Sequence, residues 1–477
     1  MNCNFRRLLA SIVLSTVAAA GLAQDDVAAR IAGAAMTRSG ASAFLEKLTD
    51  TVGGRVTGSA ECRAASELIL AALKDAGYEN AHSEEYELAS RWQRGPAIGR
   101  IVSPIARPIT VGSMAWVPGT AGEISAPLVD IGAPPSNDWT PPADRVRGAA
   151  VLVDLRKVGD DPAFVMRSLM ARKLAAAGAA AMLVPSDKPS RMVYTSAFGF
   201  YPKGPLPVIS VAKEDSLLLR RLLAKGPVRL GLDVKNTFDT RPYRERNVIA
   251  DLPGGALKDE VVLLGAHFDS WDPAQGANDD GSGVAAVLEA ARILKSLNVK
   301  PRRTIRFAFF SGEEEALLGS RAYVAMHEQE LDRLRAVLIM DSGAQGPLGF
   351  QIQGRTDLEA ALKVKLAPLA PLGAAGLSLE ATFDQDHAPF LAVGVPAFAL
   401  WVEPGEYDIH HHAITDTFDQ VDPRMLAIDT AVMAIAAYAL ADAAEPLGRR
   451  LSAAEASELM KKTGVEGTRQ MVYRPLP

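Results

Sequence analysis

Cysteine is scarce in this chain: only Cys3 and Cys62 occur among 477 residues. Small exported domains that lack a large core depend on several disulfides, and this composition excludes that class of protein. Because Cys3 lies in a predicted signal segment, Cys62 is left alone in the mature chain and no intramolecular disulfide is expected. Any metal site must therefore rely on ligands other than thiolate.

An excess of positive charge is also absent. Lys and Arg number 51 against 56 Asp and Glu, which gives a formal net charge of −5. Nucleic-acid-binding domains carry a basic patch or stripe, so nucleic acid is not an expected partner. The content of 48% hydrophobic and 22% charged residues is typical of soluble globular proteins. The length exceeds one ordinary hydrophobic core and favours two domains.

The N-terminus has the features of a secretory signal peptide over residues 1–23. Arg6 and Arg7 precede an apolar run over 8–20, and small residues stand at Gly21 and Ala23. The alternative is a membrane anchor, but the run is short for a span of about 20 residues. We expect cleavage, a secreted or periplasmic protein, no stable membrane insertion afterwards, and a mature charge of −5 − 2 = −7.

The pattern of apolar, proline and glycine residues changes twice along the remaining chain. Residues 24–97 and 241–477 alternate helical patterns with apolar strands, which predicts an α/β fold with a mostly parallel central sheet and helices on both faces. Residues 98–240 contain short β-like runs between proline-rich and glycine-rich turns. We predict that this segment, called the insert, is a smaller β-rich domain interrupting one catalytic domain.

Histidines and carboxylates cluster where the predicted strands end. In open parallel sheets, ligands bind at the carboxyl ends of the strands. The candidates are His267 with Asp269, Asp279 with Asp280, Glu313 to Glu315, Asp341, and His410 to His412 with Asp416. Each has a plainer explanation: the aspartates could cap a helix, the glutamates could form a solvated helix start, and the histidines could lie on the surface. Together they supply imidazole and carboxylate ligands, which suit zinc.

Taken one from each strand-end loop, these candidates supply two histidines and three carboxylates. Five protein ligands for two metals require one bridging carboxylate, and paired metals about 3.5–4 Å apart are a known solution for amide hydrolysis. The sequence therefore predicts two zinc ions per chain, with each ligand on a different strand-end loop.

The same residues resemble the co-catalytic di-zinc exopeptidase family. The resemblance rests on four segments: His267-Phe268-Asp269-Ser270-Trp271-Asp272, then Gln275-Gly276-Ala277 with Asp279-Asp280-Gly281, then Asp50 to Gly53 with Gly58-Ser59, and the histidine cluster followed by Asp416-Thr417. The insert resembles the protease-associated domain found in that family. The resemblance implies a metallo-exopeptidase that hydrolyses dipeptides or terminal residues of short peptides, and suggests a homodimer. It leaves open whether the enzyme acts at the amino terminus or at the carboxyl terminus of the peptide.

The resemblance also implies a role for each residue. Those roles are His267 and Asp341 on one zinc, Glu314 and His412 on the other, Asp279 bridging, Glu313 as general base and Asp269 orienting His267. His387 is a candidate substrate contact, with a structural role as the alternative. The register among the three glutamates follows the spacing to Gly319-Ser320, and His412 is chosen by its spacing to Asp416. The family pattern further implies a cis peptide bond after Asp279. A glutaminyl cyclase with one zinc and a non-catalytic binding protein are the alternatives.

Overall fold

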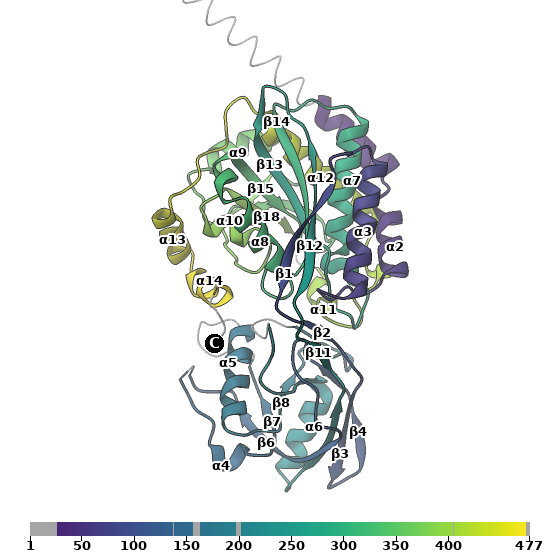
Figure 1. Cartoon of the computed structure of the whole chain (residues 1–477), viewed down its shortest axis with the longest axis vertical. Helices are drawn as coiled ribbons and strands as arrows, with labels where there is room; N and C mark the ends of the chain where they lie inside the picture. The colour runs from purple at the N-terminus through teal and green to yellow at the C-terminus, as the bar shows by residue number, and fades with distance from the viewer. Residues whose placement is uncertain (1–25, 137, 156–162, 197–201, 404, 474–477) are drawn as a thin grey trace, which may run out of the picture.

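The computed structural model describes residues 26–473 apart from 137, 156–162, 197–201 and 404. It consists of two bodies, one above the other in Figure 1, with the insert forming the lower one. The predicted signal peptide lies outside the described residues.

The upper body is built on an eight-stranded sheet. In spatial order its strands are β1 (His82–Leu88), β12 (Tyr243–Leu252), β14 (Arg303–Phe310), β13 (Leu257–His267), β15 (Leu334–Ile339), β18 (Ala397–Val402), β16 (Pro347–Gln351) and β17 (Gly376–Ser378). The central strands β14, β13, β15 and β18 run parallel, whereas β1, β12 and β16 pair with their inner neighbours in antiparallel fashion. The α/β prediction is confirmed, with antiparallel pairing confined to the flanks of the parallel centre.

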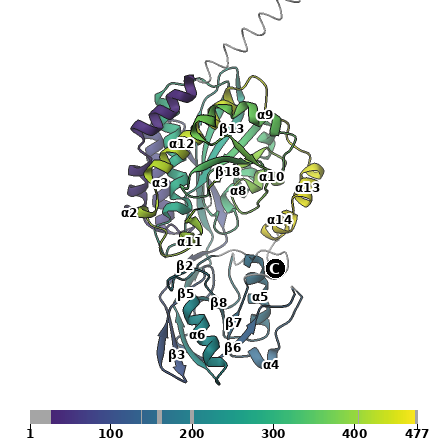
Figure 2. The same ribbon diagram turned by 180° about the vertical axis from the view of Figure 1, so that it is seen from behind.

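Helices cover both faces of this sheet. Alternate residues of β12 and β13 enter two separate cores: Val248 and Val262 pack with one set of helices, and Ile249 and Leu263 with another. The first core contains α2 (Ala41–Thr51), α3 (Ala60–Asp75), α7 (Ser282–Ser296), α9 (Glu359–Lys365) and α12 (Pro423–Asp442). The second contains α8 (Leu318–Met326) and α10 (Ala388–Ala392). The two faces are seen from opposite sides in Figures 1 and 2.

The insert contains a second eight-stranded sheet. Its strands, in spatial order, are β4 (Arg107–Ile109), β3 (Ala97–Ser103), β10 (Arg229–Val234), β6 (Ile124–Gly132), β7 (Ala150–Val153), β8 (Ala181–Pro185), β9 (Val208–Val211) and β5 (Val111–Ser113). Helices α4 (Ala143–Val146), α5 (Ala163–Ala176) and α6 (Lys213–Leu223) accompany it. A short ribbon of β2 (Arg91–Gln93) and β11 (Thr237–Asp239) connects the two bodies (Figure 1).

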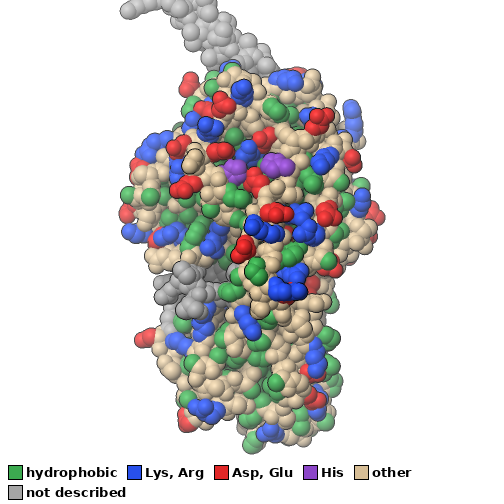
Figure 3. Space-filling view, viewed as in Figure 1, with side chains coloured by type: hydrophobic (Ala, Val, Ile, Leu, Met, Phe, Trp, Pro, Cys, Tyr) green, Lys and Arg blue, Asp and Glu red, His purple; other side chains and the backbone are tan. Residues whose placement is uncertain are grey.

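Three short helices complete the C-terminal part: α11 (Tyr407–His410), α13 (Ala453–Lys462) and α14 (Glu466–Val472). On the face drawn in Figure 3, acidic and basic side chains are interspersed over the upper body. This arrangement agrees with the balanced charge of the sequence.

Helix α12 is the one helix among the described residues that is long and apolar enough to cross a membrane. Most of it is buried against α7 and the sheet, as expected for the central helix of a large core. It also carries Asp429, which is fully buried, and neither of its carboxylate oxygens has a hydrogen-bond partner among the described residues. Burial raises the pKa of Asp429 well above its usual value.

We expect Asp429→Asn to stabilise the protein, and to do so more at pH 8 than at pH 5. The folded state holds a proton on Asp429 at pH values where the unfolded chain has released it. Stability is therefore lost as pH rises above the unfolded pKa of about 4. A buried polar group without partners costs about 1–3 kcal/mol. Thermal unfolding of both proteins at the two pH values measures the difference, and a larger gain at pH 5 would contradict this account.

Candidate metal centre

The predicted ligands converge at one end of the upper body. His267 is the last residue of β13, Glu313 and Glu314 follow β14, and Asp341 follows β15. These three strands are parallel neighbours, so their carboxyl ends lie together. His412 comes just after α11, which lies at the end of the upper body that faces the insert (Figures 1 and 2).

Asp279 stands between the two histidines. Its Oδ1 lies 3.3 Å from His267 Nε2, and its Oδ2 lies 3.1 Å from His412 Nε2. His267 Nε2 is also 3.5 Å from Asp341 Oδ1, and His412 Nε2 is 3.0 Å from Glu314 Oε2. Ligands of a tetrahedral zinc at about 2.0–2.2 Å are roughly 3.3–3.6 Å apart. The His267 contacts fall in this range, and the His412 contacts are slightly shorter. The donors on each side of Asp279 are therefore close enough together to suit a metal ion.

Unpartnered buried atoms support the same fit. In the part of the chain that the structure describes, His267 Nε2 and Glu314 Oε1 are buried without a hydrogen-bond partner. Burial raises the pKa of Glu313, Glu314 and Asp341, and repulsion from neighbouring carboxylates adds to the effect. A bound cation would compensate this concentration of buried acid.

The loop that carries Asp279 is held by two other aspartates. Asp416 accepts the backbone N–H of Asn278 at 2.7 Å and that of Asp279 at 3.2 Å. Asp280 accepts the N–H of His267 at 3.1 Å and the N–H of Gly283 at 3.0 Å, so it links the end of β13 to the start of α7. The peptide bond between Asp279 and Asp280 is cis, as the family pattern implied.

Asp269 lies behind His267. Its Oδ1 is 3.4 Å from His267 Nδ1, and its two oxygens face the backbone N–H groups of Glu313 and Glu314 at 3.3 Å each. One buried carboxylate thus touches the histidine and both glutamates. This placement is the one expected of a group that orients a ligand.

The three consecutive glutamates diverge. Glu314 reaches His412, and Glu313 is buried among His267, Asp341 and Glu314. Glu315 turns away to the hydroxyl of Thr57 and the indole N–H of Trp116. The structure therefore places Glu313 and Glu314 at the centre, in the register chosen from the sequence.

The three histidines also diverge. His410 Nδ1 lies 2.9 Å from Thr415 Oγ1, away from the centre. His411 stacks on His412, with 3.8 Å between ring centroids, and its Nε2 lies 3.6 Å from Asp279 Oδ2. His411 is therefore a neighbour of the centre that the sequence did not single out, while His412 makes the shorter contacts.

His387 is fully buried at the start of α10. Its Nε2 lies 3.2 Å from the carbonyl oxygen of Thr382, and burial lowers its pKa. This environment favours a structural role over the substrate contact expected from the sequence.

Two groups near the centre were not anticipated. Arg55 is fully buried and donates to the carbonyl oxygens of Phe268, Gln275 and Gly276, which fixes the loop after β13. Tyr194 of the insert places its hydroxyl 3.3 Å from His412 Nδ1. No sequence signal connects these residues to the site, because each contact spans roughly two hundred residues.

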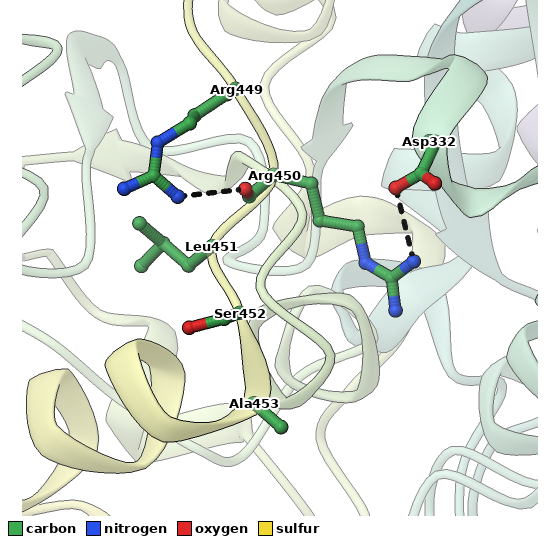
Figure 4. Close-up of a pocket in the computed structure, with 6 residues that line it drawn as sticks. All are labelled: Asp332, Arg449, Arg450, Leu451, Ser452 and Ala453. Atoms are coloured by element: carbon green, nitrogen blue, oxygen red, sulfur yellow. Dashed lines mark hydrogen bonds and ion pairs between the residues drawn. The ribbon is translucent and has the colours of Figure 1, made fainter.

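A surface pocket elsewhere has a different character. It is lined by Asp332 and residues 449–453 at the start of α13 (Figure 4). Arg450 donates to Asp332 at 3.2 Å, and Arg449 donates to the Arg450 carbonyl oxygen and pairs with Glu455. Its cations are already compensated, and none of the predicted ligands lines it.

Comparison with known proteins identifies the family. The model of peptidase family M28 matches residues 247–438, a range that contains every predicted ligand. Residues 247–438 of the chain belong to peptidase family M28. Carboxypeptidase Q of Mus musculus is 28% identical to this M28 peptidase over 410 residues, covering 84% of this chain and 86% of that protein. The prediction of a carboxypeptidase Q-like metallo-exopeptidase is confirmed at the level of family and enzyme class.

Other relatives carry a different activity in their names. A probable lipoprotein aminopeptidase of Mycobacterium tuberculosis is also 28% identical, covering 85% of each chain. A peptidase M28 precursor from Shewanella amazonensis SB2B superposes with a TM-score of 0.81 at 28% identity, covering 90% of this chain and 99% of that one. A zinc aminopeptidase from Bacillus subtilis shares the fold, with a TM-score of 0.64 at 24% identity. Because relatives named as a carboxypeptidase and as an aminopeptidase are both 28% identical to this chain, the comparisons leave open which peptide terminus is cleaved.

Proposed function

We propose that this M28 peptidase is a zinc-dependent exopeptidase that uses two zinc ions to hydrolyse dipeptides or short peptides. The observation that carries the proposal is the position of Asp279, whose two oxygens face different histidines at 3.3 and 3.1 Å. His267 and Asp341 would hold one ion, and His412 and Glu314 the other. When bound, the ions supply Lewis acidity and water of lowered pKa.

The residues of the chain would perform the proton transfers. Glu313 would accept a proton from the attacking water and return it to the leaving amine. Its position is held by the contact of its backbone N–H with Asp269. Asp269 would also fix the tautomer of His267, because Nδ1 lies 3.1 Å from the Asp269 backbone carbonyl oxygen and 3.4 Å from its carboxylate, so Nδ1 would carry the proton.

Export is part of the proposal, because residues 1–23 have the composition of a signal peptide and no disulfide is needed for the mature fold. We also propose that the insert is a protease-associated domain. Its close approach to His412 through Tyr194 supports a role at the active site.

Buried cations of the insert favour a substrate with a free carboxylate. Lys188 is 6% exposed and Arg167 is 7% exposed, and no carboxylate among the described residues pairs with either. Both lie against the ring of Tyr194, at 5.8 and 5.0 Å from its centroid, and Lys188 donates to the carbonyl oxygen of Asp408. A buried charge without a counter-ion is costly. A substrate carboxylate on this side of the centre would supply one.

Lys188→Met is therefore expected to raise KM by about 10-fold or more for peptides with a free C-terminus, the size of a lost hydrogen bond to a charged group. C-amidated peptides should be unaffected. Lys203→Met is the matched control, because Lys203 is an exposed cation of the insert 5.1 Å from the ring of Phe238. An equal rise in KM for free and C-amidated peptides would show that Lys188 does not bind the substrate carboxylate.

The function itself is tested with purified, zinc-loaded protein. The substrates are a dipeptide and three tripeptides: one free, one N-acetylated and one C-amidated, with products identified by mass spectrometry. Cleavage that leaves the C-amidated peptide intact supports an enzyme that reads the carboxylate. Failure to cleave any peptide while two zinc ions are bound would overturn the proposal and favour a cyclase or a binding protein.

A further inference from the structure

The insert contacts the candidate metal centre a second time, through Trp116. This residue follows β5 and is fully buried, and its indole N–H donates to Glu315 Oε1 at 2.7 Å. The pairing joins residues 199 positions apart in the sequence. Glu315 is itself 1% exposed, so its carboxylate depends on protein partners for stabilisation.

Contacts lead from Glu315 to the centre. Its Oε2 accepts the hydroxyl of Thr57, and the Thr57 oxygen also lies 3.0 Å from Asp269 Oδ2. Asp269 in turn contacts His267 and the backbone of Glu313 and Glu314. A continuous series of buried polar groups therefore connects the insert to one proposed ligand and to the proposed base.

Apolar packing holds the insert against the loops that flank this series. Val56 and Trp271 of the upper body belong to the same hydrophobic cluster as Trp116 and the insert core. Val56 is adjacent to Thr57, and the ring of Trp271 lies 5.9 Å from that of His412. The indole of Trp116 consequently has little freedom to move relative to the loops that carry the ligands.

We propose that Trp116, Glu315 and Thr57 are positioning residues through which the insert sets the orientation of Asp269, and through it His267 and the loop after β14. Glu315 would then have a role different from those of Glu313 and Glu314. The inference rests on the proposed function, which supplies the identity of the metal. It does not depend on which terminus of the peptide the enzyme cleaves.

Trp116→Phe tests the inference, because it keeps an aromatic ring in the cluster and removes only the N–H donor. We expect zinc affinity, measured by competition with a chromogenic chelator, to fall by about 10–100-fold, the range observed when groups behind metal ligands are removed. The kcat value should fall by a similar factor while KM changes little. Trp92→Phe is the matched control: Trp92 is 3% exposed in the same cluster, and its N–H donates to the Val117 carbonyl oxygen at 3.0 Å.

A second pair of variants keeps the test decisive if Trp116→Phe does not fold. Thr57→Val removes the hydroxyl with little change of shape, and Thr57→Ser retains it. We expect the first to lower zinc affinity and kcat and the second to restore both. Equal zinc affinity and kcat in Trp116→Phe and Trp92→Phe, or in Thr57→Val and Thr57→Ser, would overturn the inference. Loss of the proposed function is distinguishable, because the wild-type protein would then bind no zinc or cleave no peptide.

Discussion

Glu313→Gln should leave the protein folded and loaded with zinc while lowering kcat by about 10²–10⁴-fold, the usual contribution of a general base. The amide keeps the size of the side chain and cannot accept the proton. Zinc content should persist because Glu313 is not one of the five proposed ligands, which are His267, Asp279, Glu314, Asp341 and His412. Steady-state kinetics on a dipeptide, together with the zinc content of the same sample, measure both effects.

The control for this variant is Glu289→Gln. Glu289 is a buried glutamate of α7 that accepts the N–H of Gly40 at 2.9 Å and pairs with Arg292, away from the centre. Its turnover should remain that of the wild type even if its melting temperature falls. Near-normal turnover in Glu313→Gln would exclude Glu313 as the general base.

Asp279→Asn should have the widest effect of any single substitution, because it weakens both metal positions together. A neutral amide cannot bridge two cations with two anionic oxygens. We expect the zinc content to fall from two ions to one or fewer and peptide hydrolysis to be lost. Added zinc should also raise the melting temperature of this variant less than that of the wild type. For the wild type, a free zinc concentration of 100 times Kd at one site stabilises the fold by about 2.7 kcal/mol.

Asp429→Asn provides the same chemical change at a buried aspartate far from the centre, and it should retain both ions and full turnover. Two zinc ions and normal activity in Asp279→Asn would exclude the bridging role. If the wild-type protein itself bound one zinc ion and had partial activity, a single-zinc enzyme would be favoured. The contacts on the other side of Asp279 would then be structural.

The proposals for Lys188 and Trp116 place the insert at the active site in two ways. Lys188 and Arg167 lie on the His412 side, where they would meet one end of a substrate. Trp116 reaches the His267 side through Glu315. The terminus preference and the metal affinity of this peptidase should therefore both depend on the insert, although every proposed metal ligand lies outside it.

The α/β class and the strand-end positions of the proposed ligands could be inferred without the structure. Apolar runs ending at Ala266, Phe310 and Met340 predicted parallel strands, and the strand-end rule then placed the candidate histidine and carboxylates at one edge. These inferences succeed because strand and helix patterns are local properties of the chain. Motif resemblance added the roles, including the cis bond after Asp279, which no local pattern indicates.

Only the tertiary structure decided how neighbouring residues divide their tasks. Glu313, Glu314 and Glu315 have the same chemistry and adjacent positions, as do His410, His411 and His412, so spacing could suggest the register but not the direction of each side chain. That direction is set by partners distant in sequence: His412 for Glu314, Trp116 for Glu315, and Thr415 for His410. The buried cations Arg55, Lys188 and Arg167 were missed for the same physical reason, since long-range packing, and no local pattern, brings them to the site.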